Sequence, residues 1–270
     1  MVANMPLSGQ LTKDRFGYAM PVDAPLYTPF PVYYEDLRIL MFPYLTDAAA
    51  AAALLPSQFE LIPADPDGKF AIAQVVFAKY PFSNMGAYNE VAQTIMVTYK
   101  GKPGAFAVRL HVTTDQAMCA GREIGGFPKN LGTIDFIEGT TFLSTLDSPT
   151  GLRICSGELD PMQPVQGPDD HATTFYSLRL IPNPVDATKP SVCQLIETVW
   201  ELYGGKFWSA RGLLHFEGSS GLNPYHSLPI LQQMPPMIVN PQTDLERETP
   251  GVALFRGNMK ITQVMVLEDF

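Results

Sequence analysis

One lysine in this sequence stands in surroundings that could make it a nucleophile. Lys129 follows Phe127 and Pro128, and the next residues, 131–136, are again mostly apolar. A lysine amine attacks a ketone carbonyl only when it is unprotonated, and the pKa of a free lysine is about 10.4. Desolvation disfavours the ammonium form, so an apolar neighbourhood can produce a free amine near neutral pH. The local sequence therefore permits a Schiff base (imine) at Lys129.

The same segment also has a simpler interpretation. Lys129 could lie in a turn, with its amine in water and its aliphatic part packed over Phe127. Local composition alone favours this second interpretation.

Longer motifs favour the nucleophilic interpretation of Lys129 instead. Gly-Arg-Glu-x-x-x-Phe-Pro-Lys at 121–129, followed by Leu-Gly at 131–132, resembles the signature around the Schiff-base lysine of acetoacetate decarboxylases. The segment Met85–Glu90 resembles the family's Gly-x-Tyr-x-Glu motif, whose glutamate lies in the active site. Glu90 stands 39 residues before Lys129, as in the family. Weaker matches, which extend the resemblance to roughly 35–255, are Leu152–Cys155, Arg179–Asn183, Cys193–Ile196 and Ser227–Pro229.

The resemblance implies roles for residues around Lys129. Glu90 would transfer a proton or orient a hydroxyl near the imine, although it could also be an idle carboxylate in a turn. Tyr88 and Asn130 are candidates for hydrogen bonds to the substrate, and Phe127 for apolar contact with it. Side-chain alternation along a strand could equally turn Tyr88 into the core.

Three positions depart from the family pattern. Asn130 replaces the family's second lysine, so the activation of Lys129 would have to come from burial. The family's first active-site glutamate falls at Val75. Its substrate-binding arginine falls at Leu37, with Arg38 one place further along. Because a one-residue slip on a strand reverses the face, Arg38 is a candidate for substrate binding, with an exposed strand-end arginine as the alternative.

A lysine imine draws electrons from the bonds beside it, which allows several reactions. We expect a Schiff-base lyase on a keto substrate, most simply one that decarboxylates a β-keto acid. The alternatives are an aldolase–dehydratase or cyclase acting on a polyketide-like ketone, and a non-catalytic barrel that binds an apolar ketone or carboxylate. In the binding barrel, Lys129 would be a protonated counter-ion. None of these hypotheses calls for a cofactor or a metal ion.

Short strand-like runs bounded by turn residues dominate the chain and predict a mainly β fold. We expect one domain over residues 1–270: an antiparallel β-barrel or cone of the acetoacetate decarboxylase type, with a few peripheral helices. Residues 1–33 are expected to form an extended arm. Asp47 before an alanine run predicts a helix over Ala48–Leu55, closed by Pro56. The predicted strands are 70–80, 92–99, 104–112, 141–146, 152–159, 173–181, 204–217 and 261–267, and 193–202 could be helix or strand.

Composition limits the kinds of binding partner and the location that we expect for the protein. The 270 residues carry a net charge of −9, which argues against a nucleic-acid surface. No apolar run approaches a membrane span and no secretory signal is evident, so we expect a cytoplasmic protein. The low charged fraction and the resemblance favour a homo-oligomer. The scattered Cys119, Cys155 and Cys193 are expected to be reduced core thiols. Among the histidines, His226 in a polar turn is the one with a possible role.

Overall fold

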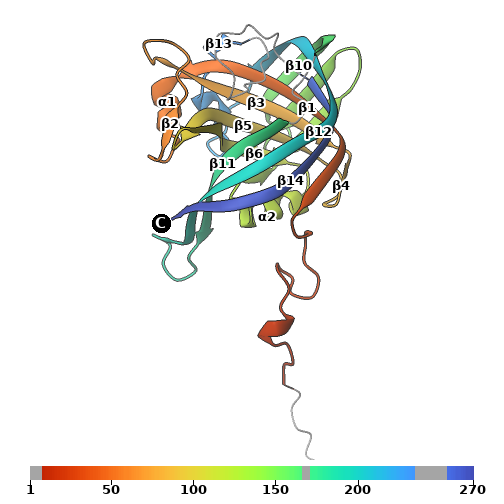
Figure 1. Ribbon diagram of the computed structural model, residues 1–270, viewed down its shortest axis with the longest axis vertical. Helices are drawn as coiled ribbons and strands as arrows, with labels where there is room; N and C mark the ends of the chain where they lie inside the picture. Colours follow the sequence, from red (N-terminus) through yellow and green to blue (C-terminus); the bar gives the residue numbers. More distant parts are fainter. Residues whose placement is uncertain (1–7, 166–170, 235–253) are drawn as a thin grey trace, which may run out of the picture.

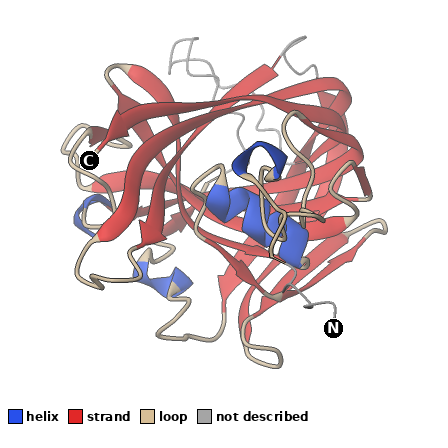
Figure 2. Ribbon diagram, turned by 90° about the horizontal axis from the view of Figure 1, so that it is seen from below, coloured by secondary structure: helices blue, strands red, loops and turns tan. Residues whose placement is uncertain are grey.

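The computed structural model describes residues 8–165, 171–234 and 254–270. Its helices are few and short and its strands are many, which confirms the mainly β prediction (Figure 2). The helical elements are η1 (Lys13–Arg15), α1 (Ala48–Ala52), α2 (Asp115–Glu123) and η2 (Tyr225–Ser227). The strands are β1 (Val32–Asp47), β2 (Phe59–Leu61), β3 (Phe70–Tyr80), β4 (Phe82–Ser83), β5 (Tyr88–Tyr99), β6 (Lys102–Val112), β7 (Lys129–Leu131), β8 (Thr133–Ile137), β9 (Phe142–Asp147), β10 (Arg153–Val165), β11 (His171–Pro182), β12 (Pro190–Phe216), β13 (Gln232–Gln233) and β14 (Leu254–Asp269).

Seven strands are hydrogen-bonded into a closed ring (Figure 1). Their order is β11-β6-β5-β3-β1-β14-β12, and β12 pairs with β11 to close the circuit. Neighbours in the ring are antiparallel, except that β11 runs parallel to β6. Closure leaves no free strand edge along this circuit, which is how all-β folds avoid edge-to-edge association. The expected barrel or cone corresponds to this ring of strands.

The strands β10, β9 and β8 continue from β12 and form an outer layer. Their apolar residues pack with the outward faces of β1, β3 and β5 in one buried cluster. Both faces of those ring strands are therefore covered, which explains why their sequences are nearly continuous in apolar residues.

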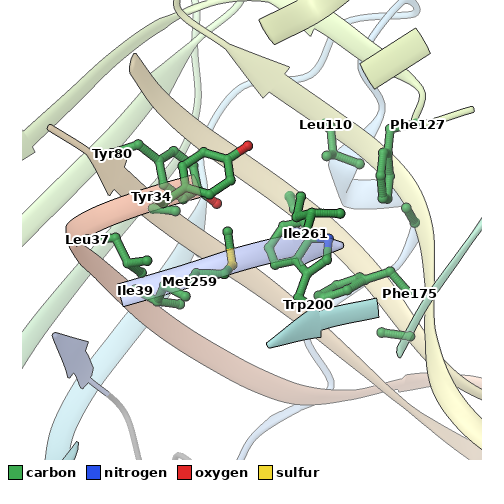
Figure 3. Packing of buried hydrophobic residues seen from close by; sticks show 14 of the residues in the cluster. Tyr34, Leu37, Ile39, Tyr80, Leu110, Phe127, Phe175, Trp200, Met259 and Ile261 are labelled. Carbon is green, nitrogen blue, oxygen red and sulfur yellow. The ribbon is translucent and has the colours of Figure 1, made fainter. Parts of the chain in front are cut away.

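Buried residues on the inward faces of all seven ring strands form what we call the inner cluster. Along each strand, every second side chain points to the same face, so these residues face the interior of the ring. Figure 3 shows ten of them by name. The members are Val32, Tyr34, Leu37, Ile39, Ile72, Ala78, Tyr80, Tyr88, Ala92, Met96, Ala105, Ala107, Leu110, Val112, Ala117, Phe127, Phe175, Trp200, Phe207, Phe255, Met259 and Ile261.

The predicted strands agree with the observed ones, apart from their ends. Residues 70–80 coincide with β3, every other predicted run overlaps an observed strand, and 193–202 lies within β12. The helix predicted over Ala48–Leu55 begins as expected, since the Asp47 side chain accepts a hydrogen bond from the backbone of Ala50 at 2.8 Å. It ends earlier, at Ala52, because the remaining residues before Pro56 form turns.

Several elements were not predicted. The long strand β1 was recognised only as an apolar stretch beginning at Arg38, and the short strands β2, β4, β7, β8 and β13 were not among the predicted runs. Helix α2 covers 115–123, where its glycine and polar residues gave no clear helical pattern. The arm before β1 extends away from the ring in Figure 1, on the side where α2 lies. Among the described helices, none has the length and apolarity needed to cross a bilayer.

The cysteine prediction holds only in part. All three are unpaired, and Cys155 lies in the core. Cys119 and Cys193 are partly exposed, so they are not core residues.

Candidate active site

The short strand β7 carries Lys129 to the inner side of the ring. It pairs in parallel with the end of β6, so that Lys129 lies beside Leu110 and Asn130 beside His111. Leu110 belongs to the inner cluster. Lys129 is 6% exposed, so the interpretation as a turn lysine with its amine in water is wrong.

The amine of Lys129 is paired with the carboxylate of Glu90. The distance from Nζ to Oε2 is 2.7 Å, and Glu90 is 2% exposed. Glu90 lies on β5, opposite Ala78 on β3 and Val112 on β6, which are both inner-cluster residues. The structure thus brings together the two residues predicted to be catalytic, and the alternative of a solvated turn carboxylate at Glu90 does not hold.

Aromatic rings surround this ion pair. The amine of Lys129 lies 5.8 Å from the ring centre of Tyr88 and 5.7 Å from that of Phe127, which are distances for cation–π attraction. The Tyr88 hydroxyl lies 3.0 Å from the hydroxyl of Tyr34, and the ring of Tyr80 packs against both at 4.7 Å. Tyr88 and Phe127 therefore lie beside the amine, and both are also buried in the inner cluster, so Tyr88 does turn into the core. Their contacts with a substrate stay predictions.

The tyrosines are held in their protonated form. Burial raises the pKa of Tyr80 well above its usual value, and the negative charge of Glu90 and a hydrogen bond to it raise that pKa further. Burial also raises the pKa of Tyr88 well above its usual value, and the negative charges that Tyr34 and Glu90 can carry raise that pKa further. These phenols can therefore donate hydrogen bonds at any ordinary pH, but they cannot serve as bases.

Helix α2 leaves room for the side chain of Lys129 at one glycine. A Cβ atom at Gly121 would lie 2.5 Å from Cδ and 2.7 Å from Cε of Lys129, which is closer than real contacts allow. Gly121 therefore lets the lysine side chain pass directly over the helix. The sequence motif contained this glycine, but its role could not be recognised before helix α2 was known.

The loop between α2 and β7 is held at several points. Arg122 donates a hydrogen bond to the backbone carbonyl of Lys129 at 3.0 Å. The Ser177 hydroxyl donates to the carbonyl of Gly125 at 2.5 Å, and Arg179 donates to the carbonyl of Glu123 at 2.6 Å. Gly126 has φ of +66°, and a Cβ there would collide with the backbone of Arg179. Gly126 thus allows the loop to pack closely on β11.

Asn130 points away from Lys129. It is exposed, and its amide donates to the side-chain oxygen of Asn223 at 3.3 Å. Behind the strand, Asn223 donates to Ser148 at 2.8 Å, and Nδ1 of His111 lies 3.1 Å from the hydroxyl of Tyr225. Sequence reasoning missed this polar group. Its one signal was the polar turn 223–227, whose His226 is exposed.

Arg38 is not brought to Lys129 either. Its guanidinium pairs with Glu138, at 3.0 Å, and with Asp36. Its strand neighbours Leu37 and Ile39 belong to the inner cluster, so Arg38 points to the opposite face of β1. Leu37, where the family's arginine falls, does face inward. Val75 faces the outer layer, and its neighbour Val76 packs on the inner cluster.

Comparison with known proteins agrees with this geometry. The family described as acetoacetate decarboxylase (ADC) matches residues 19–250. The chain belongs to the acetoacetate decarboxylase family. Its members are enzymes, and the chain is accordingly a lyase of decarboxylase type.

Relatives in this family are similar over most of their length. Decarboxylase DEC1 of Cochliobolus heterostrophus is 27% identical, over 85% of this chain and 92% of that protein. Acetoacetate decarboxylase of Streptomyces nogalater is 27% identical, over 78% and 85% respectively.

Solved structures of other proteins share the fold. The acetoacetate decarboxylase of Legionella pneumophila superposes with a TM-score of 0.77 at 22% identity, over 98% of this chain and 99% of that one. The enduracididine biosynthesis enzyme MppR, solved with the condensation product of pyruvate and imidazole 4-carboxaldehyde, has a TM-score of 0.67 at 18% identity, over 98% and 100%.

Proposed function

We propose that this enzyme decarboxylates a β-keto acid through an imine formed on Lys129. The observation that carries the proposal is the 2.7 Å contact between the Lys129 amine and Glu90, with both side chains almost fully buried. A buried amine next to a proton acceptor is the arrangement that imine chemistry requires.

The carboxylate can free the amine for attack. Holding two opposite charges in an apolar interior is costly, even when they are paired. Transfer of one proton from Nζ of Lys129 to Oε2 of Glu90 removes both charges and leaves a neutral amine. This transfer needs no second lysine, so it is compatible with Asn130 on the other face of β7.

The neutral amine then attacks the ketone carbon of the substrate. Glu90 gives its proton to the carbonyl oxygen, and the attacking nitrogen loses one of its own protons to the same oxygen. The oxygen leaves as water, and a protonated imine remains on Lys129. The bond between the α-carbon and the carboxylate breaks, its electrons move toward the imine nitrogen, and carbon dioxide departs. A proton then adds to the α-carbon, and water releases the ketone and restores Lys129.

The surroundings favour loss of carbon dioxide. The substrate carboxylate is charged before the bond breaks, whereas carbon dioxide is neutral. Tyr88, Phe127 and Leu110 present mostly apolar surface beside the amine. Leu37 at the family's arginine position adds no positive charge that would hold the carboxylate.

The second candidate reaction is an aldol condensation with loss of water through the same imine. MppR, which was solved with a condensation product, shares the fold with this chain. At 18% identity this likeness shows the fold alone, and the apolar surroundings of Lys129 support decarboxylation better.

Two measurements test the proposal. The protein is incubated with a panel of β-keto acids and methyl ketones, reduced with borohydride, and digested for mass spectrometry. A stable adduct is expected on Lys129, and release of carbon dioxide is expected from the same acids. An adduct without carbon dioxide release would replace decarboxylation by the aldol reaction. Absence of any adduct would favour a binding protein instead.

A further inference from the structure

Two buried hydrogen-bond donors on β12 have no partner within the part of the chain that the structure describes. Nε1 of Trp200 and Oγ1 of Thr198 are both shielded from solvent, and neither finds a hydrogen-bond partner among the described residues. Trp200 is 9% exposed and Thr198 is 1% exposed. Buried polar groups nearly always have a partner, so each exception calls for an explanation.

Both donors face the interior of the ring. Trp200 belongs to the inner cluster, and Thr198 lies two residues before it, on the same face of the strand. The residue opposite Thr198 on β11 is Phe175, another member of the cluster. The rings of Phe175 and Trp200 are 4.3 Å apart, and Figure 3 shows both beside Ile261.

Phe127 connects these donors with the reactive amine. Its ring centre lies 5.7 Å from Nζ of Lys129 and 6.4 Å from the ring centre of Trp200. Lys129 and Trp200 are thus both neighbours of the same aromatic ring. A ligand held by Lys129 and extended along Phe127 would come to Trp200 and Thr198.

The chemistry of the two donors limits what they can bind. An indole N–H only donates, and a threonine hydroxyl donates or accepts. Neither carries a charge, and they are surrounded by apolar side chains, where a charged group would be costly to bury. The fitting partner is a neutral oxygen atom that accepts hydrogen bonds.

We propose that Trp200 and Thr198 bind a carbonyl or hydroxyl oxygen on the substrate's chain, several carbon atoms from the ketone that reacts with Lys129. The identity of the reacting ketone rests on the proposed function. The substrate class is therefore a β-keto acid whose acyl chain carries a further oxygen. An unsubstituted chain leaves the two donors unpaired and binds less well.

The test compares straight-chain β-keto acids of one length. Each carries a hydroxyl at a different chain carbon, and the unsubstituted acid is the reference. The wild type should prefer one oxygenated acid by about tenfold in kcat/KM, the range of one neutral hydrogen bond. Thr198→Val removes one donor with little change of shape, and Trp200→Phe removes the other together with part of the indole ring. Each should reduce that preference.

Matched variants separate recognition from general damage. Thr198→Ser keeps the hydroxyl and should keep the preference. Trp208→Phe changes the other tryptophan, which packs on the outer layer, and should also keep it. An equal loss for oxygenated and unsubstituted acids in Trp200→Phe and Thr198→Val would overturn the proposal.

Binding without reaction distinguishes this inference from the proposed function. Lys129→Met cannot form an imine, so calorimetry with the corresponding methyl ketones reports recognition alone. A preference for one hydroxylated ketone there supports the inference, even if no acid is decarboxylated by the wild type. Equal binding of all ketones, or binding of none, overturns it.

Discussion

The amine of Lys129 lies 2.7 Å from the carboxylate of Glu90, and the two residues come from different strands: Glu90 from β5 of the closed ring, Lys129 from β7, which pairs with β6 outside it. Both side chains are buried, so the pair is shielded from competing water. Removal of either partner leaves the other as an uncompensated buried group. Substitutions at this contact should therefore change both the free energy of unfolding and the catalytic rate.

Replacement of Lys129 by arginine should abolish turnover. The guanidinium stays protonated and cannot form an imine, so we expect a loss of at least about a thousandfold in kcat/KM. Arginine can still pair with Glu90, so the circular dichroism spectrum should be unchanged. Lys69→Arg, at an exposed ion pair, is the control. Retained turnover in Lys129→Arg would remove this lysine from the mechanism.

A double-mutant cycle should reveal the buried pair in the free energy of unfolding. Glu90→Gln and Lys129→Met are each expected to destabilise the fold, by about 3–5 kcal/mol where the remaining partner stays charged. The double variant buries no charge and should be more stable than the sum of the single effects predicts. Urea unfolding at neutral pH measures this, and simple additivity would show that the two groups do not interact.

Gly121→Ala should lower activity without unfolding the protein. Alanine favours helix formation by about 1 kcal/mol over glycine. Its Cβ, however, would lie 2.5 Å from Cδ of Lys129, so the flexible lysine side chain must move. A displacement of about 1 Å can cost roughly a hundredfold in rate. We expect a clear fall in kcat with little change in Tm, whereas Gly221→Ala, with no atom within 4 Å of the added carbon, should change neither.

His111 should make the fold sensitive to acid. Burial lowers the pKa of His111 from 6.5 to about 4, and a hydrogen bond with Asn223 opposes part of that effect. Between these two values the unfolded chain binds a proton that the folded chain does not. The free energy of unfolding therefore falls as the pH drops from about 6.5 to about 4, by up to roughly 3 kcal/mol.

Urea unfolding over this pH range, for the wild type and His111→Gln, measures the contribution. The variant should lose most of the slope, and His226→Gln, at an exposed histidine, should retain it. An unchanged slope in His111→Gln would assign the acid sensitivity to other groups.

The sequence was sufficient for local features and for the pair at the site. β3 was predicted from its apolar, β-branched composition and its flanking turns, and Glu90 and Lys129 from motifs at a fixed spacing. Side-chain direction required the strand register. Asn130 follows Lys129 directly, but the alternation of β7 turns it toward Asn223, and Arg38 is turned outward in the same way.

Contacts between distant segments were beyond the sequence. The role of Gly121 depends on helix α2, which the local pattern did not indicate. Trp200 and Thr198 look like ordinary residues of an apolar strand in the sequence. Only the folded ring brings Trp200 near Phe127 and Thr198 opposite Phe175.

The reactive lysine sits on a three-residue strand that is bound to the edge of β6 and tied down by Arg122. The closed ring has its own continuous hydrogen-bonding, which does not pass through β7. Local opening of the segment from α2 to β7 can therefore expose the amine while the ring remains intact, at a free energy below that of global unfolding. In this architecture, the free energy that exposes the reactive amine and the free energy that unfolds the ring can therefore differ.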